Sequence, residues 1–209
     1  MTKQIFKGEI LTRTKVVNRL VATYLKTGSD DRYDWYLDAN NYAIYLAKTF
    51  NVSVVVASGI ISALSPVKQW EQNKKLAYEF IKTKGECGGH MKQFLNKARL
   101  ILQMADTEED VIKILNGRKI VSFFRNILHP NDPTLVTIDR HALSLALGVI
   151  STDELYSGMT KLQYEFFVHC YQRAAEKLNI SPLLLQSATW VYFRNNKKEW
   201  NAYESGQSF

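Results

Sequence analysis

Apolar residues recur at helical spacing along nearly the whole chain, and this pattern constrains the fold more than any other feature. One such face covers residues 10–25, and others cover residues 70–80 and 161–178. Only four prolines and ten glycines interrupt the 209 residues, which favours long helices over a turn-rich β fold. We therefore expect an all-α protein of about ten helices.

Local signals predict where several helices begin. The run VVVASGIISAL, residues 54–64, is apolar nearly all round and indicates a buried central helix capped by Ser53, with a strand as the alternative. Pro66 suits the first position of the next helix, and a residue within 29–31 suits the cap of a helix ending at Phe50. Capping signals also lie at residues 107–110 and 181–182, and the polar tail from Lys197 is expected to fray.

The length and net charge of the chain limit its possible domain organisation and binding partners. The chain suits two lobes, one of about residues 50–115 and one formed by residues 1–50 and 116–209. With 46% hydrophobic residues it is not a disordered chain, and its net charge of +7 favours a polyanionic partner, nucleic acid before membrane.

The remaining composition signals concern cofactors and compartment. Cys87 and Cys170 have no second ligand at metal-binding spacing, so we expect no metal and no cofactor. The N-terminal residues MTKQIFKGEI lack an apolar signal core, and no run approaches 18 apolar residues. We expect a cytoplasmic monomer that does not enter a membrane.

The segment from Ile114 to Gly148 carries the candidate chemistry. In Asn116-Gly117-Arg118-Lys119, a glycine between two helices permits a tight reversal, and the next helix then offers N–H groups and basic side chains to a phosphate. An ordinary helix–helix turn with solvated basic residues is the alternative.

Asp139 is the second candidate, because it precedes the apolar helix ALSLALG. It can act as a helix cap alone, which contributes ~1 kcal/mol. A carboxylate in this place can also deprotonate a nucleophile or stabilise positive charge on a sugar ring. Arg140 beside it could touch a phosphate, whereas we expect His141 to be buried and bonded to the backbone. Trp70 could stack on a base, with a core position as the alternative.

The order and spacing of these motifs resemble the helix-hairpin-helix DNA glycosylases, the superfamily that includes endonuclease III. The NGRK turn precedes IDRHALSLALG, with Lys119 twenty residues before Asp139, and both follow IISALSPVKQWEQNKKLAYEF and FLNKARLILQMADTEEDVIKIL. The resemblance covers roughly residues 50–150. The turn has one glycine where the family usually has two, and Leu64 replaces a common glutamine. A four-cysteine iron–sulfur motif is absent, as in a divergent group of phage and bacterial proteins.

The resemblance implies an α-helical fold of two lobes with a cleft, into which a target nucleotide is flipped from DNA. It implies that Asp139 is the catalytic carboxylate and Lys119 an amine that forms a Schiff base with the sugar. It implies DNA contacts from Arg140 and from the hairpin residues Asn116, Gly117 and Arg118. It also implies contacts from the segment that faces the gap left by the base, which is Ser62, Ala63, Leu64 and Ser65. Trp70 would lie in the base pocket.

Four functions compete for these residues. The first is a DNA glycosylase, with or without lyase activity. The second is a phage enzyme that hypermodifies DNA bases, uses the same Asp139 and leaves the glycosidic bond intact. The third is a non-catalytic helix-hairpin-helix module whose DNA binding depends strongly on salt. The fourth is a helical protein–protein module without a nucleic-acid role.

Overall fold

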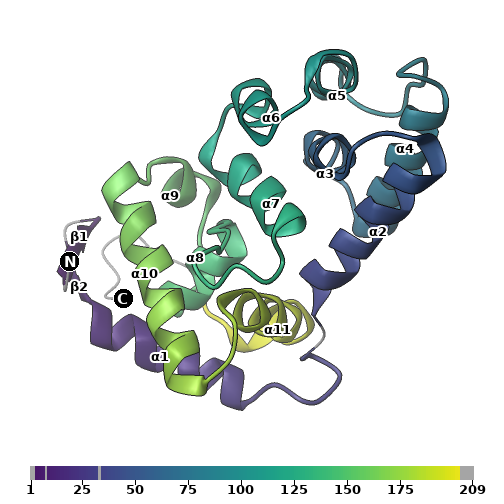
Figure 1. Ribbon diagram of the computed structural model, residues 1–209. Helices are drawn as coiled ribbons and strands as arrows, with labels where there is room; N and C mark the ends of the chain where they lie inside the picture. Colours follow the sequence, from purple (N-terminus) through teal and green to yellow (C-terminus); the bar gives the residue numbers. More distant parts are fainter. Residues whose placement is uncertain (1–2, 8, 33, 203–209) are drawn as a thin grey trace. The chain divides into compact units, whose positions relative to one another are not determined.

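The chain folds into helices throughout the part described by the computed structural model, residues 3–7, 9–32 and 34–202 (Figure 1). Eleven α-helices and one two-stranded sheet are found there, which confirms the all-α class. The chain divides into unit 1, residues 1–35 and 131–209, and unit 2, residues 36–130. The boundaries differ from those expected, because residues 36–50 and 116–130 belong to unit 2.

Unit 1 joins the two ends of the chain. Its elements are β1 (Lys3–Phe6), β2 (Glu9–Thr12), α1 (Arg13–Leu25), α8 (Arg140–Leu147), α9 (Asp153–Ser157), α10 (Lys161–Leu178), α11 (Pro182–Asn195) and a 3-10 helix η1 (Lys197–Glu199). Helix α1 packs on α8 and α10, and α11 packs on the same two helices. One continuous apolar core fills the space between them, with α8 buried along most of its length.

The N-terminal hairpin corrects the expected helix over residues 10–25. Ile10 lies in β2, where it pairs with Ile5 in an antiparallel register, and α1 begins only at Arg13. Thr12 caps this helix by accepting a hydrogen bond from the Lys15 N–H. Residues 10–12 alternate between exposed and buried sides, a strand period that the longer helical pattern of α1 masked in the sequence.

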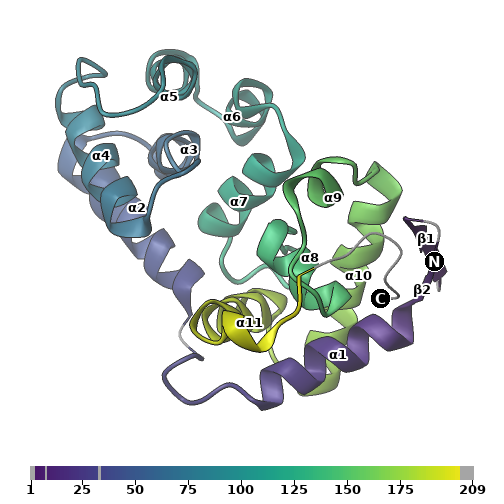
Figure 2. The ribbon, with the colours of Figure 1, turned by 180° about the vertical axis from the view of Figure 1, so that it is seen from behind.

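Unit 2 is built around one buried helix. Its elements are α2 (Trp35–Phe50), α3 (Val54–Ala63), α4 (Trp70–Lys82), α5 (Lys92–Met104), α6 (Glu108–Leu115) and α7 (Arg118–Leu128). Helix α3 packs against α4, α5, α6 and α7, and both ribbon views place it inside the unit (Figures 1 and 2). Ser53 accepts a hydrogen bond from the Val56 N–H, so the central helix and its cap are confirmed and the strand alternative is wrong.

Two expected helix starts are wrong. Helix α4 begins at Trp70 and not at Pro66, because Val67 adopts a φ of 53° that a right-handed helix cannot accommodate. Helix α2 begins at Trp35, because the side chain of Asp31 instead accepts a hydrogen bond from Gly28 in a local turn.

Other local expectations are confirmed. Thr107 and Asp110 form a capping box at the start of α6, and Ser181 caps α11 with Pro182 in its first turn. The tail is ordered further than expected, since the Ile150 N–H donates to the Asn201 carbonyl at 2.7 Å. The rest of the tail, residues 203–209, lies outside the described residues.

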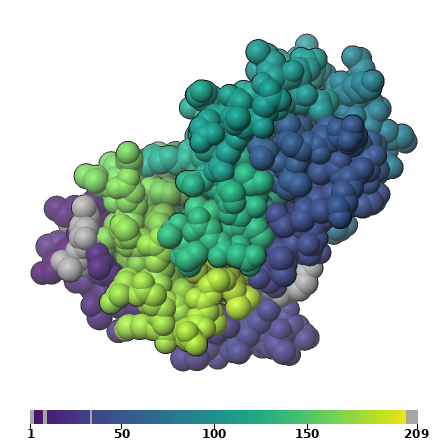
Figure 3. Space-filling model, viewed as in Figure 1, coloured from purple at the N-terminus to yellow at the C-terminus, as the bar shows by residue number. Residues whose placement is uncertain are grey.

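Among the described residues, none of the individual helices is long and apolar enough to cross a membrane; α2 and α3 reach the required length and composition only when taken together, with a bend of 116° between them. Helix α2 contributes to the outer surface of unit 2, in blue in the space-filling view (Figure 3).

Candidate active site

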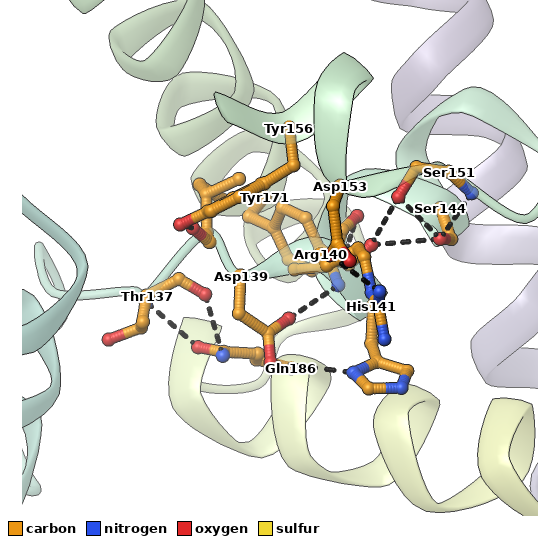
Figure 4. A network of polar contacts seen from close by, with 12 residues as sticks. Thr137, Asp139, Arg140, His141, Ser144, Ser151, Asp153, Tyr156, Tyr171 and Gln186 are labelled. Carbon is orange, nitrogen blue, oxygen red and sulfur yellow. Dashed lines mark hydrogen bonds and ion pairs between the residues drawn. The ribbon is translucent and has the colours of Figure 1, made fainter. Parts of the chain in front are cut away.

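The two residues before Asp139 are anchored by side chains and not by regular secondary structure (Figure 4). The Thr137 N–H donates to Gln186 Oε1 at 2.9 Å, and Gln186 Nε2 donates to the Thr137 carbonyl at 2.7 Å. The Ile138 N–H donates to the Tyr164 hydroxyl at 3.1 Å, and the Tyr156 hydroxyl donates to the Ile138 carbonyl at 3.0 Å. Four backbone groups are thus bonded by three side chains, which fixes the approach to Asp139.

Asp139 caps α8, as its sequence position predicted. One carboxylate oxygen, Oδ1, accepts a hydrogen bond from the Ala142 N–H at 2.7 Å. The first turn of the helix is held in place by the Tyr171 hydroxyl, which donates to the Ala142 carbonyl at 3.0 Å. The Asp139 side chain remains 20% exposed, so a rigidly placed carboxylate retains access to the surface of unit 1.

His141 faces the second carboxylate oxygen. Its Nδ1 lies 3.7 Å from Asp139 Oδ2, and its ring meets Trp190 and Phe193 of α11 edge to face, with centroids 6.1 and 5.7 Å apart. The side chain is one-third exposed, at 33%. The expectation that His141 is buried is therefore wrong, because its aromatic neighbours cover only part of the ring. Its position permits a charge-dependent contact with Asp139.

The side chain of Arg140 forms an ion pair with Asp153. Its Nη1 lies 2.6 Å from Asp153 Oδ1, and the Asp153 carboxylate is itself largely exposed. The Arg140 carbonyl accepts hydrogen bonds from the hydroxyls of Ser144 and Ser151, both at 2.8 Å. These contacts fix the first turn of α8 to the segment that follows it.

A cavity of about 100 Å³ opens beside this turn. Two cationic side chains, the imidazole and the two serines contribute to its lining, which includes Arg140, His141, Ser144, Ser151, Phe193 and Lys197. The cationic groups suit an anionic group next to the Asp139 cap.

The second candidate element is the α6–α7 hairpin of unit 2. Helix α6 ends at Leu115; its C-cap residue Asn116 has a φ of 45°, and Gly117 turns the chain with a φ of 146° that favours glycine. Gly117 occupies the N-cap position of α7 and, as a glycine, has no side chain that could form a capping hydrogen bond. The turn and the first two residues of the helix, Arg118 and Lys119, are exposed, which is the geometry expected of an anion-binding helix start.

The hairpin is braced from both ends. Glu108, at the start of α6, pairs with Arg125 at 3.0 Å and with His129 at 2.7 Å, which ties it to the C-terminal half of α7 and the residue after it. Lys97 of α5 donates to the Leu115 carbonyl at the last turn of α6. Arg125 therefore has a structural role in joining α7 to α6.

Lys119 and Asp139 belong to different units, unit 2 and unit 1, and each is described within its own unit. Lys119 offers an exposed amine in the first turn of α7. Their approach to one another therefore stays a prediction.

The expectation that Leu64 contacts DNA is wrong. Leu64 is the C-cap of α3 and is completely buried, as are Ser62 and Ala63. Ser65 is partly buried, and its hydroxyl donates to the Ser62 carbonyl at 2.9 Å. The tip of this loop is Val67, which is 85% exposed and has a φ of 53°, an unusual conformation for a β-branched residue.

Trp70 packs within unit 2. Its ring lies edge-on to Tyr42, with centroids 6.2 Å apart, and the Lys74 ammonium lies 5.6 Å from the Trp70 ring centroid. These contacts give it a packing role and leave its assignment to a base pocket a prediction.

Three residues of the site were missed in the sequence. Gln186 gave a usable signal, because it carries the one amide side chain in the largely apolar run LLLQSATW. Tyr156 and Tyr164 gave none, since a tyrosine in an amphipathic helix is most often part of the core.

Within the described ranges, no group of three or more His, Cys, Asp or Glu side chains is placed to hold a metal ion. Comparison with known families matches residues 2–197 to DUF7178, a family of unknown function. The chain belongs to this family. Neither the curated proteins nor the solved structures contain a match to it.

Proposed function

We propose that the protein is a DNA glycosylase with Asp139 as its catalytic carboxylate. The observation that carries the proposal is the placement of this side chain. One oxygen is fixed by the Ala142 N–H, the preceding backbone is anchored by Gln186, and the carboxylate is still partly exposed. A rigid anion of this kind is suited to stabilise a cationic sugar.

The reaction breaks the bond between sugar C1′ and the base nitrogen, and its electron pair leaves with the base. The Asp139 carboxylate stabilises the positive charge that develops on the sugar ring and accepts a proton from the water that attacks C1′. That water supplies the hydroxyl of the sugar product, and the released base takes up a proton. The imidazole of His141, 3.7 Å from the carboxylate, lies where it can exchange that proton with Asp139.

The hairpin supports DNA as the substrate. Gly117 occupies the N-cap position of α7 and has no side chain to cap it, and Arg118 and Lys119 add two exposed positive charges. Unit 2 as a whole carries 13 Lys and Arg residues against 8 Asp and Glu, a balance of +5. A phosphodiester is the anion that fits both features.

In the loop after α3, Val67 offers an exposed apolar side chain, which was the role expected of Leu64. Val67 is exposed and held in a strained backbone conformation, and such strain concentrates at functional positions. We assign to it the role of filling the gap that the flipped base leaves, since apolar wedges are commonly inserted between base steps. Val67→Gly is expected to weaken binding to duplex DNA and to leave the fold intact.

Lyase activity would depend on Lys119. Its amine would attack C1′ and form a Schiff base after the base has left, and borohydride would reduce this adduct to a stable covalent complex. A trapped complex with the wild-type protein and none with Lys119→Ala is the expected result for a bifunctional enzyme. Base release without any trapped complex would assign a monofunctional glycosylase.

The central experiment incubates the protein with modified and unmodified DNA and identifies the products by mass spectrometry. Free base from the wild type and none from Asp139→Asn is the expected result. Glu176→Gln, which removes an exposed charge from α10, is the matched control and should release base normally. An altered nucleoside still attached to DNA would instead assign base hypermodification. Unchanged DNA with salt-dependent binding would assign a non-catalytic module.

A further inference from the structure

Aromatic and basic side chains alternate along one row of α4. Trp70, Lys74, Tyr78 and Lys82 are spaced four residues apart, so they follow one another along the same face of the helix. The row is about 18 Å long, because each helical residue advances the axis by about 1.5 Å. This pattern is distinct from the Asp139 site and from the α6–α7 hairpin.

Helix α2 widens this row with three more rings. The Tyr42 ring lies 5.8 Å from the Tyr45 ring and 6.2 Å from the Trp70 ring, and the Phe50 ring lies 5.0 Å from the Tyr78 ring. The Tyr42 hydroxyl donates to the Lys74 carbonyl at 2.8 Å, which holds the two helices side by side. Both ribbon views show α2 alongside α4 (Figures 1 and 2). The two helices thus present one combined face, which we call the aromatic–lysine face.

The lysines of this face lie over its rings. The Lys74 ammonium is 5.8 Å from the Tyr42 ring centroid and 5.6 Å from that of Trp70, and the Lys82 ammonium is 5.9 Å from that of Tyr78. Glu71 pairs with Lys74 at 2.8 Å and Glu79 with Lys82 at 3.8 Å. The exposed Lys48 and Lys75 belong to the same two helices, so α2 and α4 together carry four lysines against three acidic residues, Asp38, Glu71 and Glu79. The two helices together therefore carry a net charge of +1.

The rings are accessible and uncharged. Tyr45 is 50% exposed, and the other rings of the face are partly exposed. Burial, together with the neighbouring Tyr45, Tyr78 and Glu71, raises the pKa of Tyr42 to about 12. Its phenol stays neutral at ordinary pH and does not repel a phosphate.

We propose that the aromatic–lysine face of α2 and α4 binds a single-stranded nucleic acid. Bases stack on the exposed rings, which tolerate any sequence, while the lysines follow the phosphates. Stacked bases are spaced about 3.4 Å apart, so a row of about 18 Å accommodates about five nucleotides. Bases in a duplex are already stacked on one another, which makes a single strand the partner that fits.

The test measures the fluorescence anisotropy of a labelled oligothymidylate of about ten nucleotides, titrated with the whole protein over a range of salt concentrations. Tyr45→Ala should weaken binding about five-fold or more, because stacking contributes ~1–3 kcal/mol per base, and Tyr45→Trp should preserve it. Lys82→Ala should lower the slope of log affinity against log salt by about 0.7, the value for one phosphate contact on a single strand.

Lys161→Ala is the matched control, because Lys161 forms an exposed ion pair of the same length, 3.8 Å, with Glu165 on α10. Its slope and affinity should equal those of the wild type. Circular dichroism of each variant separates a lost surface from a lost fold. Equal effects of Lys82→Ala and Lys161→Ala, or unchanged binding by Tyr45→Ala, would overturn the proposal, as would the absence of binding by the wild type.

This proposal fails independently of the glycosylase assignment. It is tested by oligonucleotide binding, whereas the glycosylase assignment is tested by base release, and Asp139 is not part of this face. If Lys119→Ala abolishes the binding and Lys82→Ala leaves it unchanged, the strand is held by the hairpin and not by α2 and α4.

Discussion

Gln186 and Thr137 exchange two hydrogen bonds although they are 49 residues apart, with the amide of one side chain matching the N–H and C=O of one backbone residue. Both residues are buried. The pair therefore reproduces the bonding of a β-bridge without a second strand, and it fixes the backbone two residues before Asp139. Buried backbone groups satisfied in this way are costly to leave unpaired.

Gln186→Leu should destabilise the protein by about 2–4 kcal/mol, because it leaves the N–H and the C=O of Thr137 buried without partners. Urea denaturation followed by circular dichroism measures the change. Gln172→Leu is the matched control: Gln172 also donates to a backbone carbonyl, that of Thr134, but at an exposed site where water replaces it. Its effect should stay below about 0.5 kcal/mol. Similar losses for the two variants would show that burial of the Thr137 pair does not matter.

Substitutions of Asp139 should separate its structural role from its chemical role. Asn caps helices as well as Asp does, so Asp139→Asn should change stability by only a few tenths of a kcal/mol, whereas Asp139→Ala should lose ~1 kcal/mol. Both variants should lose base release equally. Thermal unfolding and mass spectrometry on the same preparations provide the two measurements. Base release that parallels stability across the two variants would assign Asp139 to helix capping alone.

Signals that act within a few residues could be predicted from the sequence. The cap at Asp139, the capping box of Thr107 and Asp110, and the Ser181-Pro182 start of α11 each depend on hydrogen bonds that span three residues. The buried α3 was also predictable, because a helix that is apolar all round has no face to expose.

Features set by distant contacts could not be predicted in this way. Leu64 and Val67 are both apolar and lie in the same loop, yet the packing around α3 buries the first and exposes the second. The positive φ of Val67 runs against the preference of a β-branched residue, so no sequence rule would place the tip of the loop there. The pairing of Gln186 with Thr137 depends in the same way on the packing of α11 beside the segment before α8.

Gly59→Ala should destabilise unit 2, because α3 packs closely at this residue. A Cβ placed on Gly59 would lie 2.8 Å from Val111 Cγ1 and 3.1 Å from Ile101 Cγ2, both side chains of buried residues. Overpacking of this kind costs about 1–3 kcal/mol, or about 2–12 °C in Tm for a chain of this size. Gly28→Ala has no atom within 4 Å of its new Cβ and should leave Tm nearly unchanged. Differential scanning calorimetry of both variants measures the two Tm values. Equal Tm values for the two variants would contradict the close packing at Gly59.

His90 should make the stability of unit 2 depend on pH in the neutral range. Burial lowers the pKa of His90 below its usual 6.5, and the charge of Lys68 lowers it further, against the opposing effect of the Pro66 and Leu64 carbonyls. The unfolded chain therefore binds more protons than the folded chain once the pH falls to about 6.5. The contribution of neutral His90 to the free energy of unfolding is fully present above 6.5, the pKa of His90 in the unfolded chain. This contribution is lost as the pH falls from 6.5 to the lower pKa of His90 in the folded chain.

The measurement compares urea midpoints at about pH 7.5 and about pH 5.5. His90→Gln should reduce the fall in the urea midpoint between these two pH values. The variant also loses the contact between the His90 and Phe94 rings, whose centroids are 4.7 Å apart, but this loss lowers the midpoint equally at both pH values. Lys68→Gln should reduce the decline in part, because it removes the second cause of the lowered pKa. Asp110 cannot account for the effect: hydrogen bonds from Thr107 lower its pKa below 3.8, so its contribution changes only in more acidic solution. A decline of the same size in His90→Gln would assign the pH dependence to another group.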